Sequence, residues 1–313
     1  MNEAGSRIDG PLSIPARIAE GHKGTFGTTL VIGGAITPRI MAGAPSLAAR
    51  GALRSGCGLT VVAAPRSIAT VVTELIPEST VLPLDVGDEV HPETAERCLE
   101  AVRDAHAVVC GCGLGSPDGV EAMVEAIADC EERPRVLDAD ALNALAGAGP
   151  RTMRGPVVLT PHPGEWGRLA RSVGIDGDPF EDERRPLAAA ALARRLDSGG
   201  GPVVVVLKGA RTVVSDGERW WRCDRTNPAL ATGGSGDVLA GVIGGLLAQF
   251  HPRAGAPASR FTRDAFDLAC IGVELHSLAG RAWSSLHGDA GLLAGELADS
   301  IPDARRLLQS RHA

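Results

Sequence analysis

The sequence predicts a three-layer α/β fold in which a mostly parallel central sheet carries helices on both faces. Short runs rich in β-branched residues recur along the chain, with Ala-rich helical stretches between them, as in successive βαβ units. The strand runs are almost continuously apolar, which is typical of parallel strands buried on both faces. The 313 residues are 44% hydrophobic and 22% charged, enough to bury one large core. We therefore expect a single domain over 1–313.

Strand and helix alternate along most of the chain. Strands are expected at 28–32, 59–64, 105–110, 134–137, 156–160 and 203–207. The helices between them are expected at 42–55, 92–104, 118–131, 164–173 and 186–197. A β-hairpin is predicted at 212–222, and the last third is mainly helical, with helices at 236–250, 263–285 and 291–300 and a Pro- and Gly-rich break at 251–259. Residues 1–20 are predicted to form a loosely attached arm.

Charge and cysteine usage limit the classes of partner. A net charge of -7 gives no general attraction for nucleic acid or anionic membranes, so a phosphate must be met by a local site. No N-terminal targeting segment is seen, and the apolar runs are shorter than the roughly 18 residues that span a membrane. We expect a soluble, cytoplasmic protein with small-molecule partners. Reduced, mostly buried thiols are expected at Cys57, Cys98, Cys110, Cys112, Cys130, Cys223 and Cys270, which lack CxxC spacing.

The sharpest motif is the segment 227–237, Asn-Pro-Ala-Leu-Ala-Thr-Gly-Gly-Ser-Gly-Asp, which runs directly into an apolar helix. Its glycines let the backbone approach an anion, and successive N–H groups at a helix start can bind phosphate oxygens. A carboxylate in that position repels phosphate, so Asp237 is predicted to take a proton from a hydroxyl during phosphate transfer. The alternative, an ordinary first-turn Asp stabilised by the helix dipole, is less favoured because Ala-Thr-Gly-Gly precedes it. The surrounding residues of this cradle are Gly233, Gly234, Ser235 and Gly236.

Other polar clusters follow the predicted strands, where ligands bind in open parallel sheets. Lys208 comes after five apolar residues and is predicted to hold a nucleotide phosphate, although a strand-terminal lysine is often only solvent-facing. His162 lies between two prolines that restrict its loop, and substrate contact and an incidental loop position are about equally favoured. Asp138, Asp140 and Asn143 offer oxygen ligands for Mg²⁺ or a sugar, but capping of the next helix is the better interpretation for at least one.

Several other enzyme classes are excluded by their motifs. The turn Gly-Cys-Gly-Leu-Gly at 111–115 has GxGxG rather than GxGxxG spacing, which disfavours a hydride-transferring dinucleotide enzyme. The sequence contains no GxxxxGK[ST], HExxH or GxSxG motif. P-loop, zinc-protease and hydrolase activities are therefore not expected.

Taken together, these motifs resemble the ribokinase-like family of NAD(P)H-hydrate dehydratases, whose carbohydrate-kinase-type domain also occurs fused to an epimerase domain. The resemblance spans roughly residue 23 to the end. It implies a ribokinase-like fold and a stand-alone repair enzyme, with no epimerase domain expected. The segments that carry it are Lys-Gly-Thr-Phe-Gly at 23–27, Val-Ile-Gly-Gly at 31–34, Ala-Leu-Arg-Ser-Gly-Cys-Gly-Leu at 52–59, and the stretches 137–143, 160–165 and 227–239.

The resemblance implies a reaction in which an adenine nucleotide phosphorylates the ring hydroxyl of hydrated NADH or NADPH. Phosphate then leaves and the nicotinamide double bond is restored, so the net change is a dehydration of the S epimer. ADP is the expected donor, giving AMP and phosphate, with ATP as the alternative. Mg²⁺ is the expected cofactor, its ligands unassigned, and a homo-oligomer is expected, a homotetramer being one candidate.

The same resemblance implies roles for individual residues. Asp237 is the base that faces the hydrate. The hydrate would also contact Ala44, Gly115 and His162. The adenine nucleotide would be held by Lys208, Gly209, Ala210, Arg211, Thr212 and Gly236. Supporting roles are expected for Asp140, Asn143, Glu165, Gly233, Gly234 and Ser235.

Two departures from the family pattern affect the hydrate side, and two rival functions remain. Cys112 stands where the third-strand turn usually has proline, and the segment 35–44 has fewer small residues than is usual. A kinase of a small alcohol, such as a sugar, hydroxymethylpyrimidine or thiazole, would use the same cradle and Asp237. A non-catalytic nucleotide-sensing module is the second rival, and it predicts that Asp237→Asn leaves the biological role intact.

Overall fold

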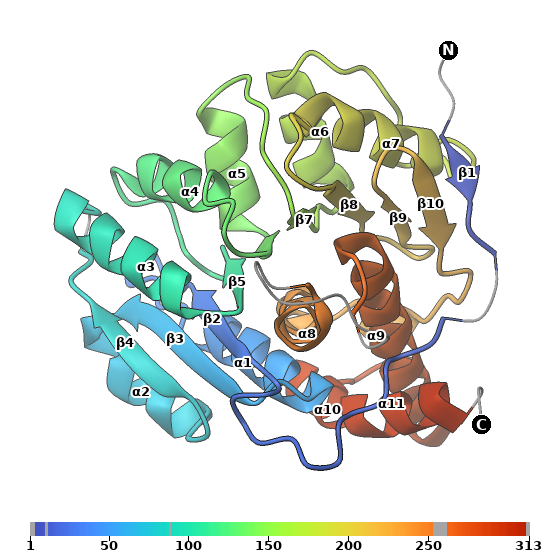
Figure 1. Ribbon diagram of the computed structural model, residues 1–313, viewed down its shortest axis with the longest axis horizontal. Helices are drawn as coiled ribbons and strands as arrows, with labels where there is room; N and C mark the ends of the chain where they lie inside the picture. Colours follow the sequence, from blue (N-terminus) through green and yellow to red (C-terminus); the bar gives the residue numbers. More distant parts are fainter. Residues whose placement is uncertain (1–3, 10–11, 88, 253–261, 311–313) are drawn as a thin grey trace.

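A computed structural model describes residues 4–9, 12–87, 89–252 and 262–310 (Figure 1). Within these residues, ten strands form one sheet in the order β1-β10-β9-β8-β7-β6-β5-β2-β3-β4. Strands β2 to β8 are parallel to one another, and β9 is antiparallel to both β8 and β10. The strands are β1 (Ser6–Arg7), β2 (Thr28–Ile32), β3 (Leu59–Pro65), β4 (Thr80–Leu84), β5 (Ala107–Cys110), β6 (Arg135–Leu137), β7 (Val157–Leu159), β8 (Val203–Leu207), β9 (Val213–Ser215) and β10 (Arg219–Arg222).

Helices cover both faces of this sheet, which confirms the predicted three-layer class (Figure 1). Alternate residues of one strand enter different layers: Val31 packs under α1 and α8, while Leu30 and Ile32 pack under α3 and α4. The helices are α1 (Gly43–Ser55), α2 (Ala69–Leu75), α3 (Pro92–Asp104), α4 (Val120–Ala128), α5 (Asp140–Gly147), α6 (Pro163–Ser172), α7 (Arg185–Leu196), α8 (Ser235–Phe250), α9 (Ala265–His287), α10 (Ala294–Asp299) and α11 (Ile301–Ser310), with 3₁₀ turns η1 (Arg66–Ile68) and η2 (Pro228–Leu230).

The helix α8 is held close to α1 by glycines at their crossing. A Cβ on Gly241 would lie 1.9 Å from the Ala48 carbonyl oxygen, and one on Gly51 would lie 2.6 Å from that of Val238. Only glycine permits this approach of two backbones. The contact fixes the position of the α8 N-terminus relative to the sheet.

The N-terminal segment, predicted to be a loosely attached arm over 1–20, makes several contacts in its described part. β1 pairs with β10, and Arg17 donates to the Gly56 carbonyl at 3.0 Å while its guanidinium lies over the Phe26 ring. An edge strand with unpaired backbone groups accepts such an addition, and Ile14 of the same segment is buried.

The remaining predictions agree with the structure where it can be compared. Every predicted strand and helix is present with its ends shifted by a few residues, and the hairpin at 212–222 is confirmed. Most of the break at 251–259 lies outside the described residues. All seven cysteines are free and all but the half-buried Cys130 are buried. In the described part of the chain, no helix is both long enough and apolar enough to cross a membrane.

Candidate functional site

The segment predicted to be an anion cradle lies at the start of α8. Gly234 precedes the helix with φ of +88°, and a Cβ there would lie 2.6 Å from Leu47 Cδ1, so the turn requires glycine. The first-turn N–H groups of a helix have no carbonyl partners within that helix, and its dipole adds a partial positive charge. A Cβ on Gly236 would lie 3.5 Å from Lys208 Nζ. The cradle and the strand-end lysine therefore meet, as predicted.

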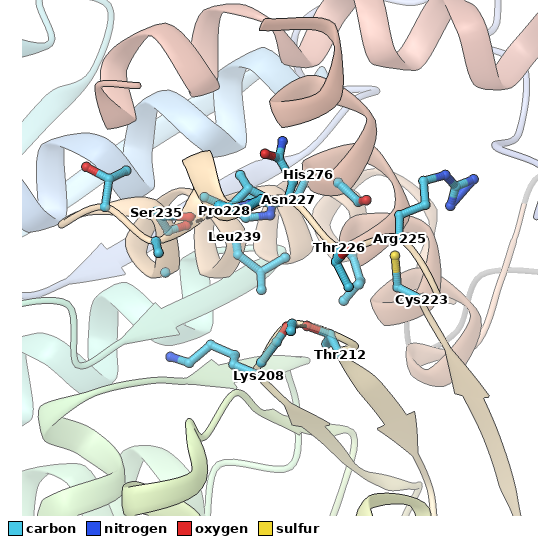
Figure 2. A pocket seen from close by; sticks show the side chains of 18 residues that line it. Lys208, Thr212, Cys223, Arg225, Thr226, Asn227, Pro228, Ser235, Leu239 and His276 are labelled. Atoms are coloured by element: carbon cyan, nitrogen blue, oxygen red, sulfur yellow. Dashed lines mark hydrogen bonds between the residues drawn. The ribbon is translucent and has the colours of Figure 1, made fainter. Parts of the chain in front are cut away.

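A cavity of about 530 Å³ opens beside this cradle (Figure 2). The β8–β9 turn contributes Lys208 and Thr212 on one side, and η2, α8 and α9 form the other side, as Figure 2 shows. A cleft of this size with apolar walls and a few polar groups is the usual form of a small-molecule site. Its lining includes Lys208, Gly209, Ala210, Thr212, Thr226, Leu230, Ser235, Gly236, Leu239, Val273, His276 and Ser277.

Lys208 lies in a buried charge network at the cavity wall. Its Nζ is 2.6 Å from Asp138 Oδ1 and 3.8 Å from Glu165 Oε2, and Thr160 Oγ1 donates to the same Asp138 oxygen at 2.7 Å. Asp138 is only 2% exposed. Burial disfavours the ammonium, but the carboxylates of Asp138 and Glu165 outweigh it and raise the pKa of Lys208. The lysine therefore remains a cation beside the helix start, where an anion would bind.

Asp237 is in the first turn of α8 and close to a second carboxylate. One ligand atom each of Asp237, Asp138 and Cys112 lie within 4.8 Å of one another. Burial and the Asp138 charge raise the pKa of Asp237 to about 7, against a hydrogen bond from Cys112 and the attraction of Lys208. A carboxyl group with a pKa near neutrality is matched to accepting a proton at physiological pH.

His276 is a site residue that the sequence analysis did not single out. It comes from the middle of α9, and its Nε2 is 3.1 Å from Ser235 Oγ and 3.0 Å from the Ser235 carbonyl oxygen. Burial lowers its pKa to about 4, so the ring is neutral at pH 7. Since a carbonyl only accepts, Nε2 carries the hydrogen and anchors the start of α8. A histidine within an apolar helical stretch gives no sequence signal for this role.

The predicted hydrate contacts lie in separate turns. Asp140 Oδ2 accepts the Gly115 N–H at 2.8 Å, and Arg168 Nε donates to Asn143 Oδ1 at 2.9 Å. Ala44 is the second residue of α1 and lies against the 111–115 turn, since a Cβ on Gly113 would be 2.9 Å from the Ala44 Cβ. Asp140, the first residue of α5, points to Gly115 while Asp138 points to Lys208.

His162 is the N-cap of α6 and forms a capping box with Glu165. Its Nδ1 accepts the Gly164 N–H at 3.0 Å, and Glu165 Oε2 accepts the His162 N–H at 2.8 Å. Through Glu165 this loop joins the Lys208 network. The imidazole is about half exposed and so accessible to a ligand.

Arg211 differs from its neighbours in the β8–β9 turn. Its side chain pairs with Asp182 and does not line the cavity. Gly233 and Gly234 also lie outside the lining and shape the turn behind it. The structure therefore brings Lys208, Gly209, Ala210, Thr212, Ser235 and Gly236 together around one cavity, but not Arg211.

A divalent cation of the Mg²⁺ class takes oxygen ligands, and the residues here fit it in part. Asp138 uses Oδ1 for Lys208 and Thr160, while its Oδ2 faces Gly236 at the cradle. The Cys112 thiol is not a ligand that Mg²⁺ favours. Asp138 Oδ2, with phosphate oxygens of a nucleotide, is the donor set that fits.

Comparison with known proteins assigns the chain to a family. The family model described as NAD(P)H-hydrate dehydratase matches residues 29–303. The chain is 37% identical over 307 residues to the ADP-dependent (S)-NAD(P)H-hydrate dehydratase of Neisseria meningitidis, covering 96% of this chain and 91% of that protein. It is 35% identical over 305 residues to the bifunctional NAD(P)H-hydrate repair enzyme Nnr of Moorella thermoacetica, covering 95% of this chain. The chain spans about half the length of that relative, 52%.

A solved structure extends the likeness to three dimensions. The ADP/ATP-dependent NAD(P)H-hydrate dehydratase of Bacillus subtilis, co-crystallised with ATP and Mg²⁺, superposes with a TM-score of 0.71 at 30% identity, covering 95% of each chain. The fold is therefore ribokinase-like in the arrangement of its sheet and helices, as the sequence predicted.

Proposed function

Since this chain belongs to the family of NAD(P)H-hydrate dehydratases, we propose that it dehydrates the S epimer of hydrated NADH or NADPH with ADP as phosphate donor. The products are NADH or NADPH, AMP and phosphate. The observation that carries this proposal is Asp237, a carboxyl group with a pKa near 7 at a helix N-terminus beside the Lys208 cation.

The nucleotide binds in the cavity between the β8–β9 turn and α8. Leu230, Leu239 and Val273 offer an apolar surface for the adenine base. The phosphates lie toward Lys208 and the first turn of α8, whose N–H groups and dipole stabilise negative charge. Gly209, Ala210 and Thr212 line the same side of the cavity.

Asp237 acts as the general base of the first step. Its carboxylate takes the proton of the ring hydroxyl while that oxygen bonds to the terminal phosphorus of ADP, and the bond to the AMP oxygen breaks. Lys208 and the α8 start stabilise the charge on the phosphoryl oxygens. In the second step the ring carbon loses phosphate, the adjacent carbon loses its proton to the departing phosphate, and the electron pair of that C–H bond forms the double bond.

The hydrate is proposed to contact Ala44, Gly115 and His162. These residues follow the carboxyl ends of the parallel strands β2, β5 and β7. Asp140 and Asn143 support the Gly115 turn, and Glu165 supports His162. Mg²⁺ would be held by Asp138 Oδ2 and ADP oxygens, and when bound it neutralises phosphate charge. We also place the protein in the cytoplasm. We expect a homo-oligomer, and light scattering after size exclusion would measure its mass.

A single assay tests the reaction. Purified protein is incubated with chemically hydrated NADH, Mg²⁺ and either ADP or ATP, and the NADH absorbance band is followed, with Asp237→Asn as the matched variant. Recovery of absorbance that needs a nucleotide and is lost in the variant supports the proposal and identifies the donor. No recovery from protein that binds ADP would contradict it and favour a small-alcohol kinase, detected as a stable phosphorylated product.

A further inference from the structure

Arg185 is a buried cation directly behind the nucleotide cavity. It is the first residue of α7, is 4% exposed, and does not line the cavity. Its Nη2 donates to the carbonyl oxygens of Leu207 at 2.8 Å and Lys208 at 3.0 Å. Its Nη1 donates to the Pro179 carbonyl at 2.6 Å. The guanidinium therefore holds the carboxyl end of β8 in place through the carbonyls of Leu207 and Lys208.

Among the residues that the structure describes, no carboxylate hydrogen-bonds to Arg185. Its hydrogen bonds there go to three backbone carbonyls, and its buried Nε has no partner among the same residues. Asp182 acts on it electrostatically but is itself paired with Arg211. Burying a cation without a paired anion is unfavourable, because the desolvation of the charge is not compensated. A bound anion on the other side of the turn would offset that cost.

The hydrogen bond to Lys208 also sets the direction of the next N–H. The Lys208–Gly209 peptide is trans, so its N–H points opposite to its carbonyl. Because the carbonyl faces Arg185, the Gly209 N–H faces away from Arg185, toward the side where Gly209 and Ala210 line the cavity. A Cβ on Gly209 would lie 2.7 Å from Arg185 Nη2, so the residue must be glycine for the guanidinium to sit this close.

We propose that Arg185 is a positioning residue for nucleotide phosphate: it aims the Gly209 N–H at the phosphate of ADP and places an uncompensated positive charge behind it. This rests on the proposed adenine-nucleotide site. Arg185 touches neither nucleotide nor hydrate, so its effect is on ADP affinity rather than on the chemical step. The hydrogen bonds need the planar fork of arginine, which lysine lacks.

Calorimetric binding of ADP and of adenosine to the full chain tests the assignment, using wild type, Arg185→Met, Arg185→Lys and Arg195→Met. Arg195 is an exposed residue of the same helix and controls for loss of one charge. We expect Arg185→Met to weaken ADP binding about 10- to 100-fold, as loss of charge-assisted contacts implies, while adenosine binding changes less than about threefold. Arg185→Lys should recover part of the ADP affinity, and Arg195→Met should match wild type.

A general collapse of the cavity would weaken adenosine as much as ADP, and that result would overturn the proposal. So would ADP affinity within about twofold of wild type in Arg185→Met. If Arg185→Met does not fold, Arg185→Lys provides the test. Full ADP affinity in that variant would contradict a role for the planar guanidinium group. No hydrate or turnover is needed, so wild-type protein that binds ADP but lacks dehydratase activity would contradict the proposed function and leave this inference standing. Wild-type protein that binds no ADP would overturn both.

Discussion

The two sides of the proposed site are built in different ways. The nucleotide side is a formed cavity lined mostly by residues between 208 and 239, together with Val273, His276 and Ser277 of α9. The hydrate side consists of Ala44 in the first turn of α1, Gly115 in the turn after β5, and His162 at the N-cap of α6, and these do not line that cavity. Nucleotide binding therefore depends on backbone shape that a short segment encodes, whereas hydrate binding depends on how distant turns are held together. Substitutions on the two sides should affect different kinetic constants.

The largest effect is expected at the residue between the two sides. Asp237→Asn removes the base but not the cradle, so kcat should fall about 10²- to 10⁴-fold while the ADP dissociation constant stays within about threefold. NADH recovery and ADP calorimetry measure the two quantities. Asp303→Asn, an exposed carboxylate of α11, is the control. A fall in ADP affinity as large as the fall in kcat would contradict the separation of the two sides.

Lys208→Met should lower the stability of the protein and weaken its binding of ADP. The variant leaves Asp138 and Glu165 buried without their cation, and the free energy of unfolding should fall by about 3–5 kcal/mol in urea titration. KM for ADP should rise as well. Arg211→Met, which removes an exposed ion pair, should cost no more than about 1 kcal/mol. If Asp138→Asn in the Lys208→Met background does not recover part of the stability, the two residues are not coupled.

The raised pKa of Asp237 predicts a pH-dependent difference in stability. Its folded-state pKa of about 7 lies above the ordinary value of 3.8. Between pH 3.8 and about 7 the folded protein therefore keeps a proton on this carboxyl group that the unfolded protein has lost. Wild-type stability relative to Asp237→Asn is therefore full below about pH 4 and is lost as the pH rises to about 7. We expect Asp237→Asn to be more stable by roughly 2 kcal/mol at pH 8, less than the full shift implies because the side chain is partly exposed. Urea unfolding of both proteins from pH 4 to 8 measures this. A difference in the free energy of unfolding between them that stays constant with pH would rule the prediction out.

The smallest effect is expected on the hydrate side. Asp140→Ala removes the acceptor of the Gly115 N–H, worth about 1–2 kcal/mol, so KM for the hydrate should rise about tenfold or less with ADP affinity unchanged. Asp140→Asn keeps an acceptor oxygen, so its KM for the hydrate should lie between those of wild type and Asp140→Ala. Glu100→Ala, on the exposed face of α3, serves as the control. Equal rises in KM for hydrate and ADP would show that the two sides are not independent.

Most of the sheet was predictable because its strands are continuous apolar runs, and the misses have physical causes. β4 contains Pro83, which argues against a strand, yet as an edge strand it needs fewer backbone donors. α2 has several β-branched residues and only seven residues in all, but burial of Val72 against the sheet favours the helix. β1 has two residues and depends on the open edge of β10.

The sequence by itself determined the α/β class and the glycine turn that begins the helix after residue 234, because hydrophobic periodicity and turn chemistry are local properties. Only the tertiary structure decided that Asp138 reaches Lys208 across the sheet, that burial together with the Asp138 charge raises the pKa of Asp237, and that His276 bonds Ser235. It also decided that Arg185 lies behind Gly209 and that Arg211 turns away to Asp182. Burial and the distance between charges depend on residues far apart in the chain, so no local pattern encodes them.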